Sequence, residues 1–444
     1  MTNSQLFPID ENIVANCLTQ LRIEQLSKAT IRDIFMLSDL IQKQSGLEFI
    51  RMELGVPGLP ASEIGVNAEK EALQSGVASI YPMVDGIKPL KFEAARFVKL
   101  FMDIQVSEQG CIPTVGSMQG TYAAMLTTSR MQEGKNTILF IDPGFPVQKQ
   151  QIAVMGAQLK NFDIKNHRGR KLQHILDEYL NQGDICAIVY SNPNNPTWVC
   201  LTEEELQIIG ESANKHDIVV LEDLAYFGMD FRKEIKYPGQ APFQPTVARY
   251  TNNWIMFISS SKIFSYAGQR IGMMIISDEI FNKECPSFLK TFNSPTFGST
   301  ITQRVLYALS SGTSHSSQYA MTAMLKAAND GEYNFIDDVK TYGDKARIMK
   351  KIFTDNGFHI IYDKDDDQDI ADGFYFTIGY RNMGGERLLN LLLHYGISAI
   401  TLTNTGSNEE GLRACTSFIK ASQFSLLQER LQLFNQHFIH LNKH

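Results

Sequence analysis

The chain has 444 residues, of which 43% are hydrophobic and 20% are charged. At roughly 100–200 residues per domain this length predicts two or three domains, and the hydrophobic content excludes a disordered chain. The net charge of −7 argues against a broad nucleic-acid-binding face. The six cysteines lie far apart and form no C-x-x-C pair. We therefore expect neither a disulfide framework nor a metal site.

The N-terminus has no feature of a targeting segment. Its first residues, MTNSQLFPIDEN, include acidic side chains and no apolar run. No window of the sequence approaches the ~18 uninterrupted apolar residues of a membrane span. We therefore expect a soluble, cytoplasmic protein with neither a membrane nor a nucleic acid as its partner.

The predicted elements change in kind along the chain. Residues 11–44 have the apolar spacing of one helix, and Gly55 and Pro57 break the chain after it. Short apolar runs typical of buried strands then alternate with helices, and they lie at 137–141, 185–190, 218–221, 254–259 and 273–276. Such alternation predicts a mainly parallel sheet between helices. From about residue 310 the pattern changes to long helices, at 318–329 and 337–356, followed by a few strands.

Polar side chains follow three of these strands. Asn195 comes after the run 185–190, Asp223 and Tyr226 come after 218–221, and Lys262 and Arg270 come after 254–259. Because ligands bind beyond the carboxyl ends of strands in open α/β sheets, these side chains should converge on one site. Taken singly, each has an ordinary alternative as a turn residue, a helix cap or a surface charge.

The order and spacing of these motifs resemble the fold-type I pyridoxal-phosphate (PLP) enzymes, specifically the class I/II aminotransferases. The matching residues are Asn195-Pro-Thr, Asp223-x-Ala-Tyr226, and Ser259-x-Ser261-Lys262 with Arg270 eight residues later. The resemblance extends from about Gly55 to Arg413. It implies an α/β fold with a large PLP-binding domain, built on a mainly parallel seven-stranded sheet between helices, and a smaller α+β domain.

We assign the large domain to residues 55–309 and the small domain to 310–444. The N-terminal segment 1–54 is expected to pack with the small domain.

The resemblance also implies roles at the reacting end of the cofactor. Lys262 would form the Schiff base with the PLP aldehyde, and burial beside the cationic Arg270 should lower the pKa of its amine. Asp223 would pair with the pyridinium nitrogen, while Tyr226 and Asn195 would hydrogen-bond the phenolate oxygen. Lys262, Asp223 and Tyr226 are thus the predicted catalytic residues.

The remaining cofactor contacts concern the phosphate. Arg270 would bind it with its planar guanidinium, helped by the hydroxyls of Ser259 and Ser261. The segment Gly116-Ser117-Met118 resembles the family's turn, in which backbone N–H groups at a helix N-terminus hold the anion.

Other matches concern the ring, the substrate and the partner subunit. Phe145 falls where the family stacks an aromatic ring on the cofactor. Arg413 would clamp the α-carboxylate of the amino acid, with Gly55 and Asn195 beside it. Tyr81 resembles the tyrosine that reaches the phosphate of the neighbouring subunit's cofactor, which implies an obligate homodimer with shared active sites.

The sequence departs from the family in three places. Trp198 replaces the usual glycine after Asn-Pro-Thr, and it either narrows the pocket or covers the loop. Residues 401–404 replace the usual Pro-Gly before the substrate arginine. The segment 287–299 resembles the subunit-crossing stretch but lacks an arginine for a distal carboxylate, so a dicarboxylate substrate is not favoured.

The function that the resemblance implies is amino transfer between an amino acid and a 2-oxo acid. The alternative on the same scaffold is a PLP-dependent lyase that performs β-elimination, since both reactions begin from the same cofactor adduct. A non-catalytic regulator is disfavoured because only about fifty residues precede Gly55, with no basic helix-turn-helix pattern.

Overall fold

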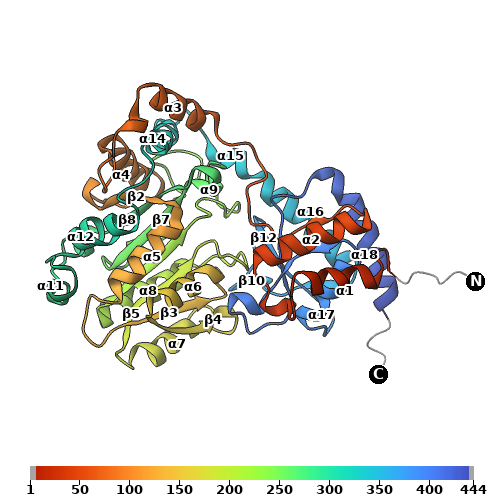
Figure 1. The fold of residues 1–444 in the computed structure, drawn as a ribbon. Helices are drawn as coiled ribbons and strands as arrows, with labels where there is room; N and C mark the ends of the chain where they lie inside the picture. Colours follow the sequence, from red (N-terminus) through yellow and green to blue (C-terminus); the bar gives the residue numbers. More distant parts are fainter. Residues whose placement is uncertain (1–6, 440–444) are drawn as a thin grey trace, which may run out of the picture.

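The computed structural model describes residues 7–439, which form a larger and a smaller unit side by side (Figure 1). A seven-stranded sheet in the order β2-β8-β7-β6-β5-β3-β4 is the centre of the larger unit. The strands are β2 (Cys111–Val115), β3 (Thr137–Asp142), β4 (Gln158–Asp163), β5 (Ile185–Ser191), β6 (Val219–Leu224), β7 (Trp254–Ser259) and β8 (Ile271–Ile276). Only β8 runs antiparallel to its neighbours β2 and β7. The predicted mainly parallel sheet is therefore confirmed.

Helices cover both faces of this sheet. The helices of the larger unit are α3 (Glu63–Gln74), α4 (Lys88–Met102), α5 (Gly116–Thr128), α6 (Pro146–Met155), α7 (Lys171–Leu180), α8 (Glu203–His216), α9 (Ser260–Ile263), α10 (Asp278–Asn282), α11 (Pro286–Phe292), α12 (Phe297–Thr300), α13 (Tyr307–Ser310), α14 (His315–Asn329) and α15 (Phe335–Val339). Successive side chains of a strand point to opposite faces of the sheet, so they belong to different apolar clusters. In β5, Ile188 packs on the side of α4, α7 and α14, whereas Val189 packs on the side of α5.

The smaller unit is built from an N-terminal and a C-terminal segment of the described chain. Its sheet has the order β14-β15-β12-β9, and its elements are α1 (Glu11–Gln20), α2 (Ile31–Ser45), α16 (Thr341–Asp355), α17 (Gly385–Leu393), α18 (Phe424–Phe438), β1 (Ile50–Arg51), β9 (Phe358–Ile360), β10 (Lys364–Asp365), β11 (Gln368–Asp369), β12 (Tyr375–Tyr380), β13 (Ile397–Ser398), β14 (Ile400–Thr401) and β15 (Leu412–Cys415). Figure 1 shows the red helices α1 and α2 beside the blue helices α17 and α18. Leu37 and Ile41 of α2 share one buried apolar cluster with Leu389 and Phe434.

The prediction of one helix over 11–44 is wrong, because the chain forms α1 and α2 with a break between them. The hydroxyl of Thr30 accepts a hydrogen bond from the N–H of Asp33, and the carboxylate of Asp33 accepts one from the N–H of Thr30. This capping box starts a new helix at Ile31. The apolar spacing runs through both helices because both face the same core.

The domain boundary at residue 309 stays a prediction, and the packing favours a later one. Met321 and Met324 of α14 belong to the apolar cluster of the large sheet, as does Ile336 of α15. Between residues 7 and 439, no helix is long and apolar enough to cross a membrane.

Candidate active site

A cavity of about 340 Å³ lies beyond the carboxyl ends of β5, β6 and β7. Most of the predicted site residues line it, namely Gly55, Ser117, Met118, Phe145, Asn195, Asp223, Tyr226, Ser259, Ser261, Lys262, Arg270 and Arg413. Gly116 lies beside it, against Arg270. Tyr81 is 89% exposed and lies outside it. The cavity thus collects residues of the large sheet together with Gly55 and Arg413, which come from outside it.

Lys262 lies on the short helix α9, directly after β7. Its amine donates a hydrogen bond to the carbonyl oxygen of Gly55 and lies 5.1 Å from the ring centroid of Phe374. Burial, together with the positive charges of Arg413 and Arg270, lowers the pKa of this amine to about 8. Near neutral pH the fraction of Lys262 that is neutral, and therefore nucleophilic, is much larger than for an ordinary lysine.

Asp223 lies at the end of β6 and is 7% exposed. Its carboxylate accepts hydrogen bonds from the side-chain amide of Gln148 at 2.9 Å and from the backbone N–H of Ala225 at 3.1 Å. Burial raises the pKa of Asp223 to about 6. A cation placed against it would favour the ionised form. Gln148, on α6, was not predicted, because no motif singles it out.

Another part of the cavity lining favours an anion. Arg270 and the N-terminus of α5 meet there, and the N–H of Gly116 donates to the carbonyl oxygen of Arg270 at 2.9 Å. Gly116 has φ +64°, and a Cβ on it would lie 2.3 Å from Nη2 of Arg270. Only glycine allows the guanidinium to pack so closely on the start of the helix. Ser259 and Ser261 add hydroxyls to the same lining.

Arg413 projects from β15 and is 1% exposed. Its guanidinium donates to the backbone carbonyl of Glu53, and its Cζ lies 4.7 Å from the ring centroid of Tyr375. The hydroxyl of Tyr375 lies 2.8 Å from the hydroxyl of Tyr226. Tyr375 lines the cavity but was not predicted, because it lies on a β12 strand that carries no motif.

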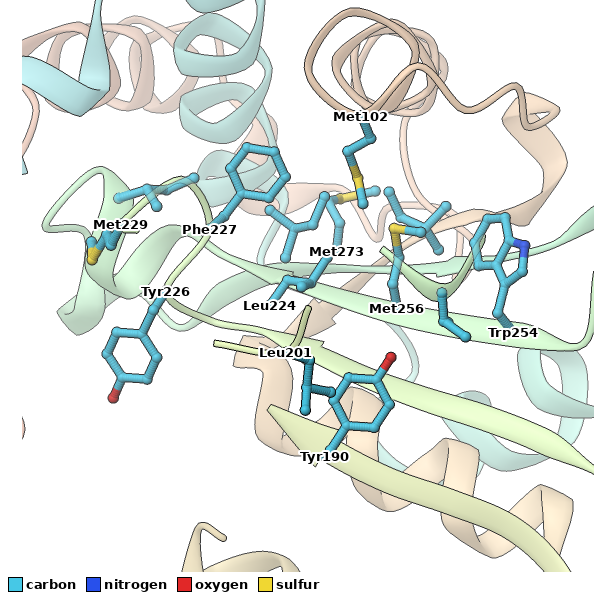
Figure 2. Packing of buried hydrophobic residues seen from close by; sticks show 14 of the residues in the cluster. Met102, Tyr190, Leu201, Leu224, Tyr226, Phe227, Met229, Trp254, Met256 and Met273 are labelled. Carbon is cyan, nitrogen blue, oxygen red and sulfur yellow. The ribbon is translucent and has the colours of Figure 1, made fainter. Parts of the chain in front are cut away.

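Trp198 does not line the cavity. It is fully buried, and its ring meets those of Tyr226 and Tyr375 edge-on, at centroid distances of 5.3 and 6.2 Å. Its φ of +68° keeps the left-handed backbone that a glycine would adopt at this position. Of the two alternatives, narrowing the pocket is therefore wrong: the indole packs behind the two tyrosines. Figure 2 shows the side chains of Tyr226 and Phe227, which follow β6, pointing in opposite directions.

The residue that follows the segment replacing the family's Pro-Gly, Thr405, docks against the loop that carries Phe145. After β14, residues 403–405 form a 3-10 turn. The carbonyl oxygen of Thr405 accepts a hydrogen bond from the N–H of Gly144 at 2.9 Å and another from the amine of Lys149 at 3.2 Å. The smaller unit thereby holds the backbone next to Phe145, on the wall of the cavity.

The residues present fit PLP. The lining offers a carboxylate for a cationic ring nitrogen, and it offers a guanidinium with a helix N-terminus for a phosphate. In addition, Oγ of Ser117, Oδ1 of Asn195 and Nε of Arg413 are buried without a hydrogen-bond partner. Buried polar atoms are rarely left unpaired, so such atoms in a cavity point to a polar ligand.

The comparison with protein families shows the family to which this chain belongs. The model of aminotransferase class I and II matches residues 55–344. The chain belongs to this family. Members of the class I and II family are PLP-dependent, so PLP is the cofactor for which this cavity is built. Arg413 and Tyr375 lie beyond the matched residues.

Individual relatives are distant. A probable aspartate aminotransferase of Methanocaldococcus jannaschii is 23% identical over 263 residues, 59% of this chain and 64% of the relative. An LL-diaminopimelate aminotransferase of Natranaerobius thermophilus is 24% identical over 335 residues, 74% of this chain and 78% of the relative. The first alignment thus spans less than two thirds of that relative. A double mutant of Thermus thermophilus aspartate aminotransferase has the same fold, with a TM-score of 0.73 at 16% identity, over 94% of this chain and 98% of the other.

Proposed function

We propose that this protein is a PLP-dependent aminotransferase, which moves an amino group between an amino acid and a 2-oxo acid. One observation carries the proposal: an amine with a lowered pKa, Lys262, faces the same cavity as the buried carboxylate of Asp223 and the buried guanidinium of Arg413. These are the groups that cofactor attachment, ring protonation and carboxylate binding require. The family match supports the same activity.

Bound PLP supplies a ring that withdraws electrons from the α-carbon of the amino acid. Asp223 holds a proton at the ring nitrogen, because its ionised carboxylate stabilises the cation. Arg270, the α5 N-terminus and the serine hydroxyls bind the phosphate. Tyr226 and Asn195 orient the ring through its phenolic oxygen. Phe145, which lines the cavity, would pack on the ring face.

Lys262 and Arg413 act on the substrate. Arg413 binds the α-carboxylate and thereby sets the orientation of the α-carbon. With PLP bound, the neutral amine of Lys262 would accept the proton from the α-carbon and would later release it to complete the amino transfer. A pKa of about 8 suits both tasks near neutral pH.

The cavity favours a donor with an uncharged side chain. The cations among its lining residues are Lys262, Arg270 and Arg413, and each already has a role. The wall near Gly55 consists of Ile31, Leu54, Val56 and Pro57. An apolar wall cannot offset the desolvation of a second carboxylate. This supports the expectation that a dicarboxylate is not the preferred substrate.

We also propose a cytoplasmic homodimer with shared sites. Tyr81 is 89% exposed and is not among the residues that line its own cavity, as a residue that serves a partner's site would be. The six cysteines are buried and free, which fits a reducing compartment. Sedimentation should give a dimer. Mixing and re-associating two inactive variants, one altered at Tyr81 and one carrying Lys262→Ala, should restore activity, and a monomer or no restoration would refute the shared site.

The activity is tested with PLP-loaded protein. Borohydride should fix the cofactor on the peptide that contains Lys262, and labelling of another lysine would refute that assignment. A panel of amino acids is then added while absorbance reports the pyridoxamine form and a second assay reports ammonia. Pyridoxamine formed in proportion to enzyme supports amino transfer. Ammonia with pyruvate would instead identify the lyase.

A further inference from the structure

Tyr375 lies where the residues for the cofactor meet those for the substrate. It is 1% exposed and lines the cavity from β12. Its hydroxyl is 2.8 Å from that of Tyr226, on the cofactor side. On the substrate side, the Cζ atom of Arg413 lies 4.7 Å from its ring centroid. A single side chain therefore contacts both groups, through chemically different parts.

The Tyr375 hydroxyl packs closely against Gly55. A Cβ on Gly55 would lie 2.4 Å from the Tyr375 oxygen, so the hydroxyl fills the space that the missing side chain leaves. The carbonyl of the same glycine accepts a hydrogen bond from Lys262. The tyrosine hydroxyl therefore packs against the glycine whose carbonyl binds Lys262.

The neighbouring rings hold Tyr375 in position. Trp198 meets it edge-on at 6.2 Å, and Phe374 and Tyr226 contact it at 5.1 and 5.5 Å between ring centroids. Tilted and edge-on contacts of this kind are the favoured aromatic arrangements. Because Trp198 is itself fully buried, it cannot move aside without opening the core. The aromatic cluster therefore fixes both the ring plane and the hydroxyl of Tyr375.

We propose that Tyr375 is a positioning residue with two separable actions. Its hydroxyl orients Tyr226, and its ring face holds Arg413 in the plane that meets the substrate carboxylate. The proposal rests on the proposed function, in which Tyr226 contacts PLP and Arg413 contacts the substrate. A hydroxyl has one proton and can accept further hydrogen bonds. When the Tyr226 hydroxyl donates its hydrogen bond to the cofactor, the Tyr375 hydroxyl can donate a hydrogen bond to the Tyr226 oxygen.

The two actions are separated by two variants. Tyr375→Phe removes the hydroxyl and keeps the ring, whereas Tyr375→Leu removes both. Each PLP-loaded variant is titrated to find the pH midpoint of its visible absorbance. The dissociation constant of 2-methylalanine, which has an α-carboxylate but no α-proton, is measured from the absorbance change. Neither the pH midpoint nor the dissociation constant requires turnover, so both can be measured even if no amino group is transferred.

In Tyr375→Phe we expect the midpoint to move by about half to one pH unit, as loss of one hydrogen bond predicts. The dissociation constant should stay within about threefold, since the aromatic face remains. In Tyr375→Leu the midpoint should move similarly, and the dissociation constant should rise about tenfold because the cation–π contact is lost.

Tyr380→Phe is the matched control, since Tyr380 lies on the same strand but does not line the cavity. Its hydroxyl donates to Oδ1 of Asn435 at 2.8 Å, so it also loses one hydrogen bond. Both readings should stay at their original values. An unchanged midpoint in Tyr375→Phe, or an unchanged dissociation constant in Tyr375→Leu, would overturn the proposal. Equal changes in Tyr380→Phe would also overturn it, because they would indicate a general effect on the fold.

Discussion

Replacing Asp223 with asparagine should have opposite effects on the protein without and with its cofactor. Burial raises the pKa of Asp223 from 3.8 to about 6. Since one pKa unit is worth about 1.4 kcal/mol, the ionised carboxylate costs the cofactor-free protein about 3 kcal/mol above pH 6. Asparagine has no charge to bury. It can still accept from Ala225, and the amide of Gln148 can rotate to accept from it.

The sign of the pH dependence follows from the direction of the pKa change. The folded state binds more protons than the unfolded state between pH 3.8 and about 6. The stability of the cofactor-free wild type should therefore fall, relative to Asp223→Asn, as the pH rises through this window. Above pH 6 the variant should be more stable by up to about 3 kcal/mol, and below pH 3.8 the difference should vanish.

Denaturant unfolding of both cofactor-free proteins between pH 4 and 8 measures the difference. Added PLP should stabilise the wild type more than the variant, because only Asp223 can pair with a cationic ring nitrogen. Loss of that charge-assisted pair, worth roughly 2–4 kcal/mol, should lower kcat about 30- to 1,000-fold. If the cofactor-free variant were no more stable than the wild type at pH 7.5, the carboxylate would not be desolvated and the reasoning would fail.

Other predictions address the phosphate end, the substrate arginine and the lysine. Gly116→Ala should weaken PLP binding at least about tenfold in a fluorescence titration, because its Cβ would displace Arg270. Gly134→Ala shares the positive φ but has open space around its Cβ, so its PLP affinity should not change. Arg413→Lys should raise KM for amino acids about tenfold or more, since a lysine cannot bind a carboxylate bidentately, with the PLP dissociation constant unchanged. Finally, the rate at which cofactor-free protein takes up PLP should rise with pH and level off above about 8, as Lys262 loses its proton, and a flat profile would contradict the lowered pKa.

The strands that the sequence predicts are those with continuous apolar runs. β3, β5, β6, β7 and β8 are buried on both faces, and their apolar runs predict them directly. β4 was missed because it is an edge strand, exposed at Gln158 and Leu159 and polar along much of its length. Its pairing with β3, rather than its own composition, makes it a strand.

The sequence alone identifies the site residues that follow those strands. Asn195, Asp223 and Lys262 each come within a few positions of a strand end, and parallel pairing brings such ends to one edge whatever the rest of the chain does. Tyr375 could not be found in this way, because it lies 149 residues from its hydrogen-bond partner Tyr226. Its position, like the side on which Trp198 packs, depends on how the smaller unit docks against the large sheet. Contacts between segments so far apart leave no local periodicity or spacing in the sequence, so only the tertiary structure decides them.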